Sequence, residues 1–129
     1  MAILRTEAFK YVGATTLKGN ELIKTSVAGN CDLATAVTDK ILGVAAHAAV
    51  TNDSLGVLMP GQVVKGIASA AISYGANVSA TAAGKLVTGA AKSVTGNTTV
   101  SYYLGWALEA AAADGDIISW MFWPTEVNV

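Results

Sequence analysis

Residues that carry acid–base, redox or metal chemistry are scarce in this sequence. Its 129 residues include one cysteine, Cys31, and one histidine, His47. A single cysteine excludes a disulfide within the chain, and a lone thiol is more often a buried small hydrophobe than a nucleophile. No second histidine or cysteine is present to form a metal cluster with His47, and no other histidine could serve as a base for Ser or Thr. We therefore interpret His47 as a core or interface residue.

Charge is also scarce and nearly balanced. Charged residues make up 13% of the chain and the formal net charge is −1, whereas an ordinary soluble domain has about 25% charged residues. The sequence lacks the clustered Lys and Arg that bind phosphates, so nucleic acid is not predicted as a partner. The uncharged stretch 66–84 is broken by Ser, Asn, Thr and Gly, which makes it a poor membrane span. The N-terminal MAILRTEAFK lacks the apolar core of a signal peptide, so we expect no membrane partner and synthesis in a cytoplasm.

Motifs for catalysis or cofactor binding are missing as well. The glycines form no GxGxxG or GxxxxGK[ST] motif between a strand and a helix. Asp114 and Asp116 lie two residues apart in ADGDI, but Ca²⁺ needs about six to eight oxygen ligands. Because Asp tolerates turn conformations and bonds its own backbone, we interpret the pair as a turn that opens a strand. The sequence predicts no enzyme, no catalytic residue, no metal site and no cofactor.

What the chain does contain is short segments rich in β-branched and aromatic residues, bounded by Gly, Asn or Asp. Such segments are typical of antiparallel strands. The strands with the strongest pattern are expected at 62–68, 76–81, 85–88, 98–108 and 116–123, and weaker ones at 8–15, 22–26 and 40–46. The alanine-rich segment 107–113 is too short to persist as an unpacked helix, so we expect at most one helical turn there. The predicted fold class is all-β, a compact sandwich or small barrel of short antiparallel strands.

An internal repeat supports this organisation. Residues 42–49 (LGVAAHAA) align without a gap with residues 104–111 (LGWALEAA), and the same spacing places 52–55 on 114–117 and Gly13 on Gly75. We therefore predict two similar halves, 1–62 and 63–124, within a single β domain spanning 13–129. Residues 1–12 are expected to form an extended N-terminal arm.

The surface of such a chain suits contact with other protein. Residues of the hydrophobic class make up 53% of the chain, so small and weakly polar side chains must cover much of its surface. The alternative is a stable monomer with a weakly charged surface. In the strand containing Trp120 and Trp123 alternate side chains face opposite ways, so one tryptophan should be core and the other should meet a partner. The alternative is that all three tryptophans are internal. The candidate interface residues, for a partner or for self-association, are Ile3, Leu4, Arg5, Phe9, Lys10, Trp106, Trp120, Phe122 and Trp123.

Two stretches resemble a known family. The segment 104–123, LGWALEAAAADGDIISWMFW, is similar to the ending of the small capsid cement (head decoration) proteins of tailed bacteriophages. In that family a Gly-x-Ala-Leu-Glu-Ala-Ala segment precedes a Gly-Asp turn and an apolar last strand. The segment 63–90, VVKGIASAAISYGANVSATAAGKLVTGA, is similar to the family's central strand and turn pattern. The chain departs from the family at 74–76, where a Gly-Asp pair is common, and in its heavier last strand.

The resemblance implies a non-enzymatic protein on the outer surface of an assembled capsid. Its partner would be the major capsid protein, whose neighbouring subunits it bridges, and copies of it would associate as homotrimers at three-fold positions. Two other readings stay open. One is a different phage structural component, such as a fibre, tail or minor coat protein, and the other is a small-ligand-binding β domain.

Overall fold

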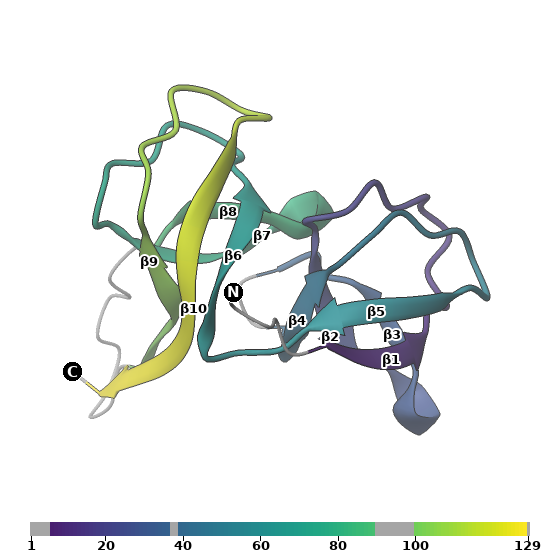
Figure 1. The fold of residues 1–129 in the computed structure, drawn as a ribbon. Helices are drawn as coiled ribbons and strands as arrows, with labels where there is room; N and C mark the ends of the chain where they lie inside the picture. The colour runs from purple at the N-terminus through teal and green to yellow at the C-terminus, as the bar shows by residue number, and fades with distance from the viewer. Residues whose placement is uncertain (1–5, 37–38, 90–99, 129) are drawn as a thin grey trace.

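The computed structural model describes residues 6–36, 39–89 and 100–128, and within them the chain is all-β (Figure 1). Ten strands form two five-stranded antiparallel sheets, which confirms the predicted fold class. The first sheet contains β1 (Thr6–Lys10), β2 (Leu22–Thr25), β3 (Cys31–Leu33), β4 (Ile41–Ala45) and β5 (Ser54–Leu58). The second contains β6 (Gln62–Ile67), β7 (Asn77–Thr81), β8 (Lys85–Thr88), β9 (Val100–Ala107) and β10 (Ile117–Asn128).

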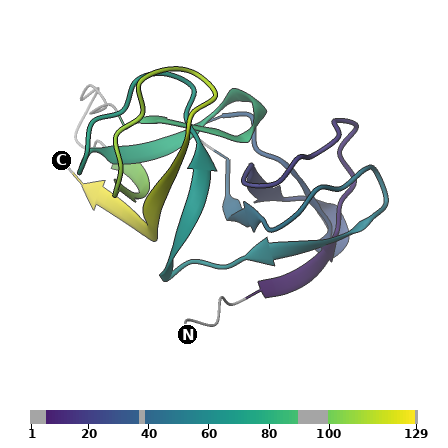
Figure 2. The ribbon, with the colours of Figure 1, turned by 45° about the horizontal axis from the view of Figure 1, so that its top comes forward.

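The two sheets have the same topology. Their strand orders are β1-β5-β4-β2-β3 and β6-β10-β9-β7-β8, so each strand of the first sheet has a counterpart in the second. A parallel bridge from Tyr11 to Cys31 joins the two ends of the first sheet, and one from Ala68 to Leu86 does the same in the second. Each sheet is therefore curled into a small barrel, and the two barrels lie side by side (Figures 1 and 2). We call them the first barrel (6–58) and the second barrel (62–128).

Backbone hydrogen bonds repeat from one barrel to the other. The Asn20 N–H donates to the Ala45 carbonyl and the Gly75 N–H to the Ala107 carbonyl, both at 2.8 Å. This equivalence of Ala45 with Ala107 agrees with the alignment of 42–49 on 104–111, and the fold is compatible with two similar halves. The alignment of Gly13 with Gly75 is wrong, because Asn20 takes the place of Gly75.

The repeat also shifts by one residue after the alanine segment. The Tyr11 N–H bonds to the Asp53 carbonyl, and the Ala68 N–H bonds to the Asp116 carbonyl. Asp53 thus corresponds to Asp116, one position beyond the ungapped alignment, because the turn of the second barrel holds one more residue.

Two groups of buried side chains form the hydrophobic core of the molecule. The first barrel encloses Tyr11, Leu17, Ile23, Cys31, Leu33, Ala45, Ala49, Leu55 and Val57. The second encloses a larger group around Trp120 and Phe122, whose ring centroids are 5.0 Å apart. This second group also includes Leu22, Ala34 and Val44 of the first barrel. Because these three residues are buried with the core of the other barrel, the halves pack as one unit.

Strand boundaries differ from expectation mainly in the first barrel. The strands β3 and β5 were not predicted, and the segment expected at 8–15 ends at Lys10. Within the expected arm 1–12, Thr6–Lys10 pairs with β5 and Tyr11 has no exposed surface, so residues 6–11 are part of the first barrel. At the other end, β10 continues past Pro124 through a register shift between Phe122 and Thr125, a place where a strand tolerates proline. No helix within the described ranges is long and apolar enough to cross a membrane.

Candidate contact surfaces

A groove of about 430 Å³ runs between the barrels, and its ionisable lining residues are Lys18, Glu21 and Lys85. The Glu21 carboxylate accepts the N–H groups of Lys18 and Gly19, both at 2.7 Å. The Lys85 ammonium contacts Asp114 at 2.7 Å. Glu21 is thus engaged in a turn of the first barrel, and Lys85 in an ion pair within the second barrel. Within the described residues no group of three or more His, Cys, Asp or Glu side chains could hold a metal ion.

The contact between the two barrels, which we call the seam, includes a tight turn of the second barrel. This turn, η2 (Ala82–Gly84), lies between β7 and β8, and the Gly84 N–H donates to the Ala34 carbonyl at 2.8 Å. A Cβ atom at Gly84 would lie 2.6 Å from Leu33 Cδ1 and 2.9 Å from the Leu22 carbonyl oxygen. The turn is therefore pressed against β2 and the end of β3, and a side chain larger than hydrogen would not fit there.

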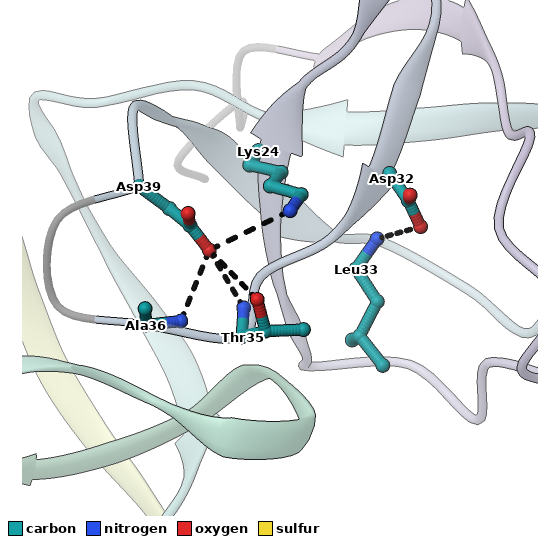
Figure 3. Close-up of polar contacts among 6 residues, drawn as sticks. All are labelled: Lys24, Asp32, Leu33, Thr35, Ala36 and Asp39. Atoms are coloured by element: carbon teal, nitrogen blue, oxygen red, sulfur yellow. Dashed lines mark hydrogen bonds and ion pairs between the residues drawn. The ribbon is translucent and has the colours of Figure 1, made fainter.

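The loop that follows Ala34 is held by one carboxylate (Figure 3). Asp39 Oδ2 accepts the N–H of Thr35 at 2.7 Å and that of Ala36 at 3.0 Å, and it lies 3.8 Å from Lys24 Nζ. The Thr35 N–H, followed by that of Ala36 and the charge of Lys24, holds the pKa of Asp39 below its ordinary value despite partial burial. The ionised carboxylate therefore fixes the loop that carries Ala34 to the seam.

This contact predicts a pH-dependent contribution to stability. Because the folded pKa of Asp39 is depressed, its contribution is present above the unfolded pKa of about 4 and is lost as the pH falls through the folded value. Asp39→Asn is expected to lower the free energy of unfolding by about 1 kcal/mol at pH 7, and the difference from wild type should shrink below about pH 4. Urea unfolding at several pH values measures this, with Glu7→Gln on exposed β1 as control. A difference that stays constant down to pH 3 would contradict the assignment.

The outer face of the second barrel carries an apolar row. Register pairs Met121 with Val63 on one side and with Trp106 on the other, and Trp106 pairs with Asn77. Cross-strand partners lie on the same face of a sheet, so one row crosses all four of β6, β10, β9 and β7. Val63 is 45% exposed and Trp106 is 38% exposed. We call Val63, Met121, Trp106 and Asn77 the outer row of the second barrel.

Beside this row is a polar cluster on the same sheet. Lys65 Nζ donates to Ser119 Oγ at 2.7 Å, and the Ser119 N–H donates to Glu109 Oε1 at 2.9 Å. Hydrogen bonds from the Ser119 side chain and from its backbone N–H, followed by the hydrogen bond and charge of Lys65, hold the pKa of Glu109 below its ordinary value. In the first barrel the His47 Nε2 accepts the N–H of Gly56 at 3.0 Å, which is the equivalent contact. His47 was interpreted as a core or interface residue, and because it is exposed the core alternative is wrong. Its ring accepts the hydrogen bond from Gly56 on the neighbouring strand β5.

The sequence-predicted site residues separate into three groups. Trp120 and Phe122 have no exposed surface and belong to the core of the second barrel, whereas Trp123 is 57% exposed. The opposite orientation predicted for the two tryptophans is confirmed, and the reading in which all three are internal is wrong. Phe9 is half-buried and Lys10 is exposed on β1. Ile3, Leu4 and Arg5 lie outside the described residues.

The sequence analysis did not identify two residues of the outer row, but it did identify the roles of Cys31 and Asp116. Val63 and Met121 were not identified as surface candidates, since only the register of β6, β10 and β9 places them beside Trp106. Cys31 is buried and free, as expected for a small hydrophobe, and burial raises the pKa of its thiol. The Asp116 carboxylate accepts the Ala112 and Ala113 N–H groups, which confirms its turn role.

The chain is thus an all-β protein of two repeated barrels with a shared core and an exposed row on the second barrel. The model of the phage cement protein family matches residues 6–121 of the chain. The chain belongs to this family, as the resemblance of its C-terminal half predicted. It is therefore a phage structural protein, and its family implies association with the phage capsid.

A solved structure has a similar fold. The head fiber gp8.5 N base of bacteriophage phi29 superposes with a TM-score of 0.64 at 18% sequence identity, covering 92% of this chain and 94% of that chain. At this identity the similarity concerns the fold, including both barrels. No curated protein sequence matches the chain.

Proposed function

We propose that the protein is a non-enzymatic decoration protein that binds the outer surface of the assembled capsid and bridges neighbouring subunits of the major capsid protein. The match of residues 6–121 to the phage cement protein family carries this proposal. A protein that binds only the assembled lattice stabilises that lattice by mass action. A low content of charged residues, 13% of the chain, suits repeated contact with other protein. The protein is made in the host cytoplasm and joins the virion as a homotrimer.

For the capsid contact we propose the N-terminal edge of the first barrel. The strand β1 lies at the end of its sheet, and among the described residues only β5 pairs with Thr6–Lys10. An unpaired edge strand is a template for another chain, and a nearby lysine adds attraction to acidic groups. Phe9 and Lys10 lie on β1, and Ile3, Leu4 and Arg5 precede it in the sequence. These five residues form the proposed capsid contact.

The test mixes purified protein with capsids that lack it. Saturable binding at a fixed copy number per capsomer, together with a higher temperature of capsid disruption, is the expected result. Binding to tails or fibres in place of capsids would overturn the proposal and favour another structural role.

A charge reversal on β1 tests the contact itself. Lys10→Glu is expected to reduce capsid occupancy several-fold while leaving the unfolding temperature unchanged, because Lys10 is exposed. Lys40→Glu, a reversal at another exposed lysine, should leave occupancy unchanged. Occupancy is measured by sedimentation of capsids over a range of protein concentrations. Equal losses of capsid occupancy in both variants would indicate an effect of net charge and would contradict a contact through β1.

A further inference from the structure

In the first barrel a side chain takes the place of a backbone acceptor where β4 and β5 stop pairing. The Ala46 N–H donates to the Gly56 carbonyl at 2.9 Å. The Gly56 N–H, in turn, donates to His47 Nε2 at 3.0 Å. The N–H group that would continue the β4–β5 ladder is therefore bound by the imidazole ring of the next residue.

The second barrel makes the same pair of contacts with a different side chain. The Leu108 N–H donates to the Ser119 carbonyl at 3.0 Å, and the Ser119 N–H donates to Glu109 Oε1 at 2.9 Å. Glu109 aligns with His47 in the repeat, and Ser119 takes the place of Gly56. The two barrels thus share one strand-end contact, in which the acceptor is a carboxylate once and an imidazole once.

These two acceptors respond differently to mild acid. Hydrogen bonds from Ser119, followed by those of Lys65, hold the pKa of Glu109 below its ordinary value, so this carboxylate remains an acceptor at pH 5 and above. Imidazole rings ordinarily gain their second proton between about pH 8 and pH 5. Once both ring nitrogens carry a proton, neither can accept a hydrogen bond.

Both ring nitrogens of His47 are engaged, and the two contacts specify one protonation state. Nδ1 lies 2.8 Å from the Ala48 carbonyl oxygen, which can only accept, so Nδ1 carries the proton. Nε2 accepts the Gly56 N–H, so it must be unprotonated. Only the neutral ring with its proton on Nδ1 makes both contacts. A proton on Nε2 would face the Gly56 N–H and leave two donors without an acceptor.

The charged groups around the ring do not replace the lost contact. The ionisable residues on the neighbouring segments are Glu7 and Lys10 on β1, Lys18 and Glu21 beside Gly19, and Asp53 before β5. The carboxylates of Glu21 and Asp53 already accept backbone N–H groups. Glu7 pairs with Val57, the residue after Gly56, so it faces the other side of the sheet. Among the described residues His47 forms no ion pair with a carboxylate.

We propose that His47 is a pH-sensitive closure of the first barrel. The neutral ring binds the end of β4 to β5, and protonation of the ring in mild acid releases the Gly56 N–H. The second barrel keeps the equivalent contact over the same pH range because Glu109 provides it. Gly56 is also the register partner of Ala8 on β1, so the released contact adjoins the segment of β5 that pairs with β1.

The free protein in solution tests this closure, so the result does not depend on the proposed function. The ring ¹⁵N chemical shifts of His47 should show the proton on Nδ1 at about pH 8 and on both nitrogens at about pH 5. Protection of the Gly56 amide against hydrogen exchange should fall roughly threefold to tenfold over this range, as expected for one hydrogen bond. Protection of the Ser119 amide should stay constant. A proton on Nε2 at pH 8, a ring still neutral at pH 5, or constant protection at Gly56 would each overturn the proposal.

Exchanging the two acceptors is the sharper test. His47→Glu gives the first barrel the acceptor of the second, so protection at Gly56 should become constant between pH 8 and pH 5. Glu109→His makes the reverse exchange, and protection at Ser119 should then fall in mild acid. His47→Ala is the control without an acceptor, and its protection at Gly56 should be low at both pH values. Thermal unfolding checks that the variants are folded, and the two His47 variants decide the question if Glu109→His is not. A pH dependence at Gly56 that persists in either His47 variant would overturn the proposal, because another group would then cause it.

Discussion

Gly105→Ala is expected to destabilise the second barrel severely. Gly105 lies in β9 opposite Phe122 with φ at 154°, a conformation that L residues rarely adopt. A Cβ atom there would lie 1.7 Å from the Met121 carbonyl oxygen and 2.9 Å from its carbon. The obstacle is the backbone of the neighbouring strand, which has no rotamer to change. We expect a loss of more than about 4 kcal/mol in the free energy of unfolding, beyond the range of most single substitutions.

A substitution at a second glycine distinguishes the energetic cost of the steric clash from that of the backbone conformation. Gly75 also has positive φ, at 79°, but a Cβ atom there would meet nothing within 4 Å. Gly75→Ala should therefore cost only about 1–2 kcal/mol, the penalty of the left-handed conformation alone. Urea unfolding followed by tryptophan fluorescence compares the two. Similar losses in both variants would show that the strands can separate around Gly105 and that the close approach is not essential.

Trp120→Ala and Trp123→Ala are expected to affect different properties. Trp120 has no exposed surface and packs against Phe122, so its truncation should lower the free energy of unfolding by about 3–5 kcal/mol. Trp123 is 57% exposed, so its truncation should change stability by less than about 1 kcal/mol. Its effect should instead appear in self-association or capsid occupancy. Equal losses of stability in the two variants would contradict the opposite orientation of these side chains.

The indole nitrogen of Trp120 allows a finer comparison. Nε1 is buried without a hydrogen-bond partner in the described structure, and a buried donor without a partner is unfavourable. Trp120→Phe removes this donor and keeps most of the ring, so it should cost well under half of the loss in Trp120→Ala. Denaturant unfolding of both variants measures this ratio. A Phe variant as unstable as the Ala variant would show that ring volume alone determines the packing.

The last strand and the repeat could be predicted because their signals are local. Alternation from Trp120 to Trp123 distinguishes the buried from the exposed face, and the alignment of 42–49 with 104–111 identifies equivalent strands. The strands β3 and β5 were missed because three residues around Asp32 and a segment interrupted by Gly56 show too little alternation. The outer row was missed for a different reason. Trp106, Met121 and Val63 lie on three strands, and only their register, which no local pattern specifies, brings them together.

The burial of Leu22 and Val44 under the second barrel has a consequence for the nascent chain. The core of the first barrel is formed by residues between Phe9 and Met59, so that barrel is complete before the second has been synthesised. Until η2 and its neighbouring strands emerge from the ribosome, the apolar face containing Leu22 and Val44 stays open to water. Such transiently open surfaces favour aggregation during synthesis. The short interval between β5 and β6, which places the covering half directly after the covered one, limits the time for which a ribosome-bound chain presents that face.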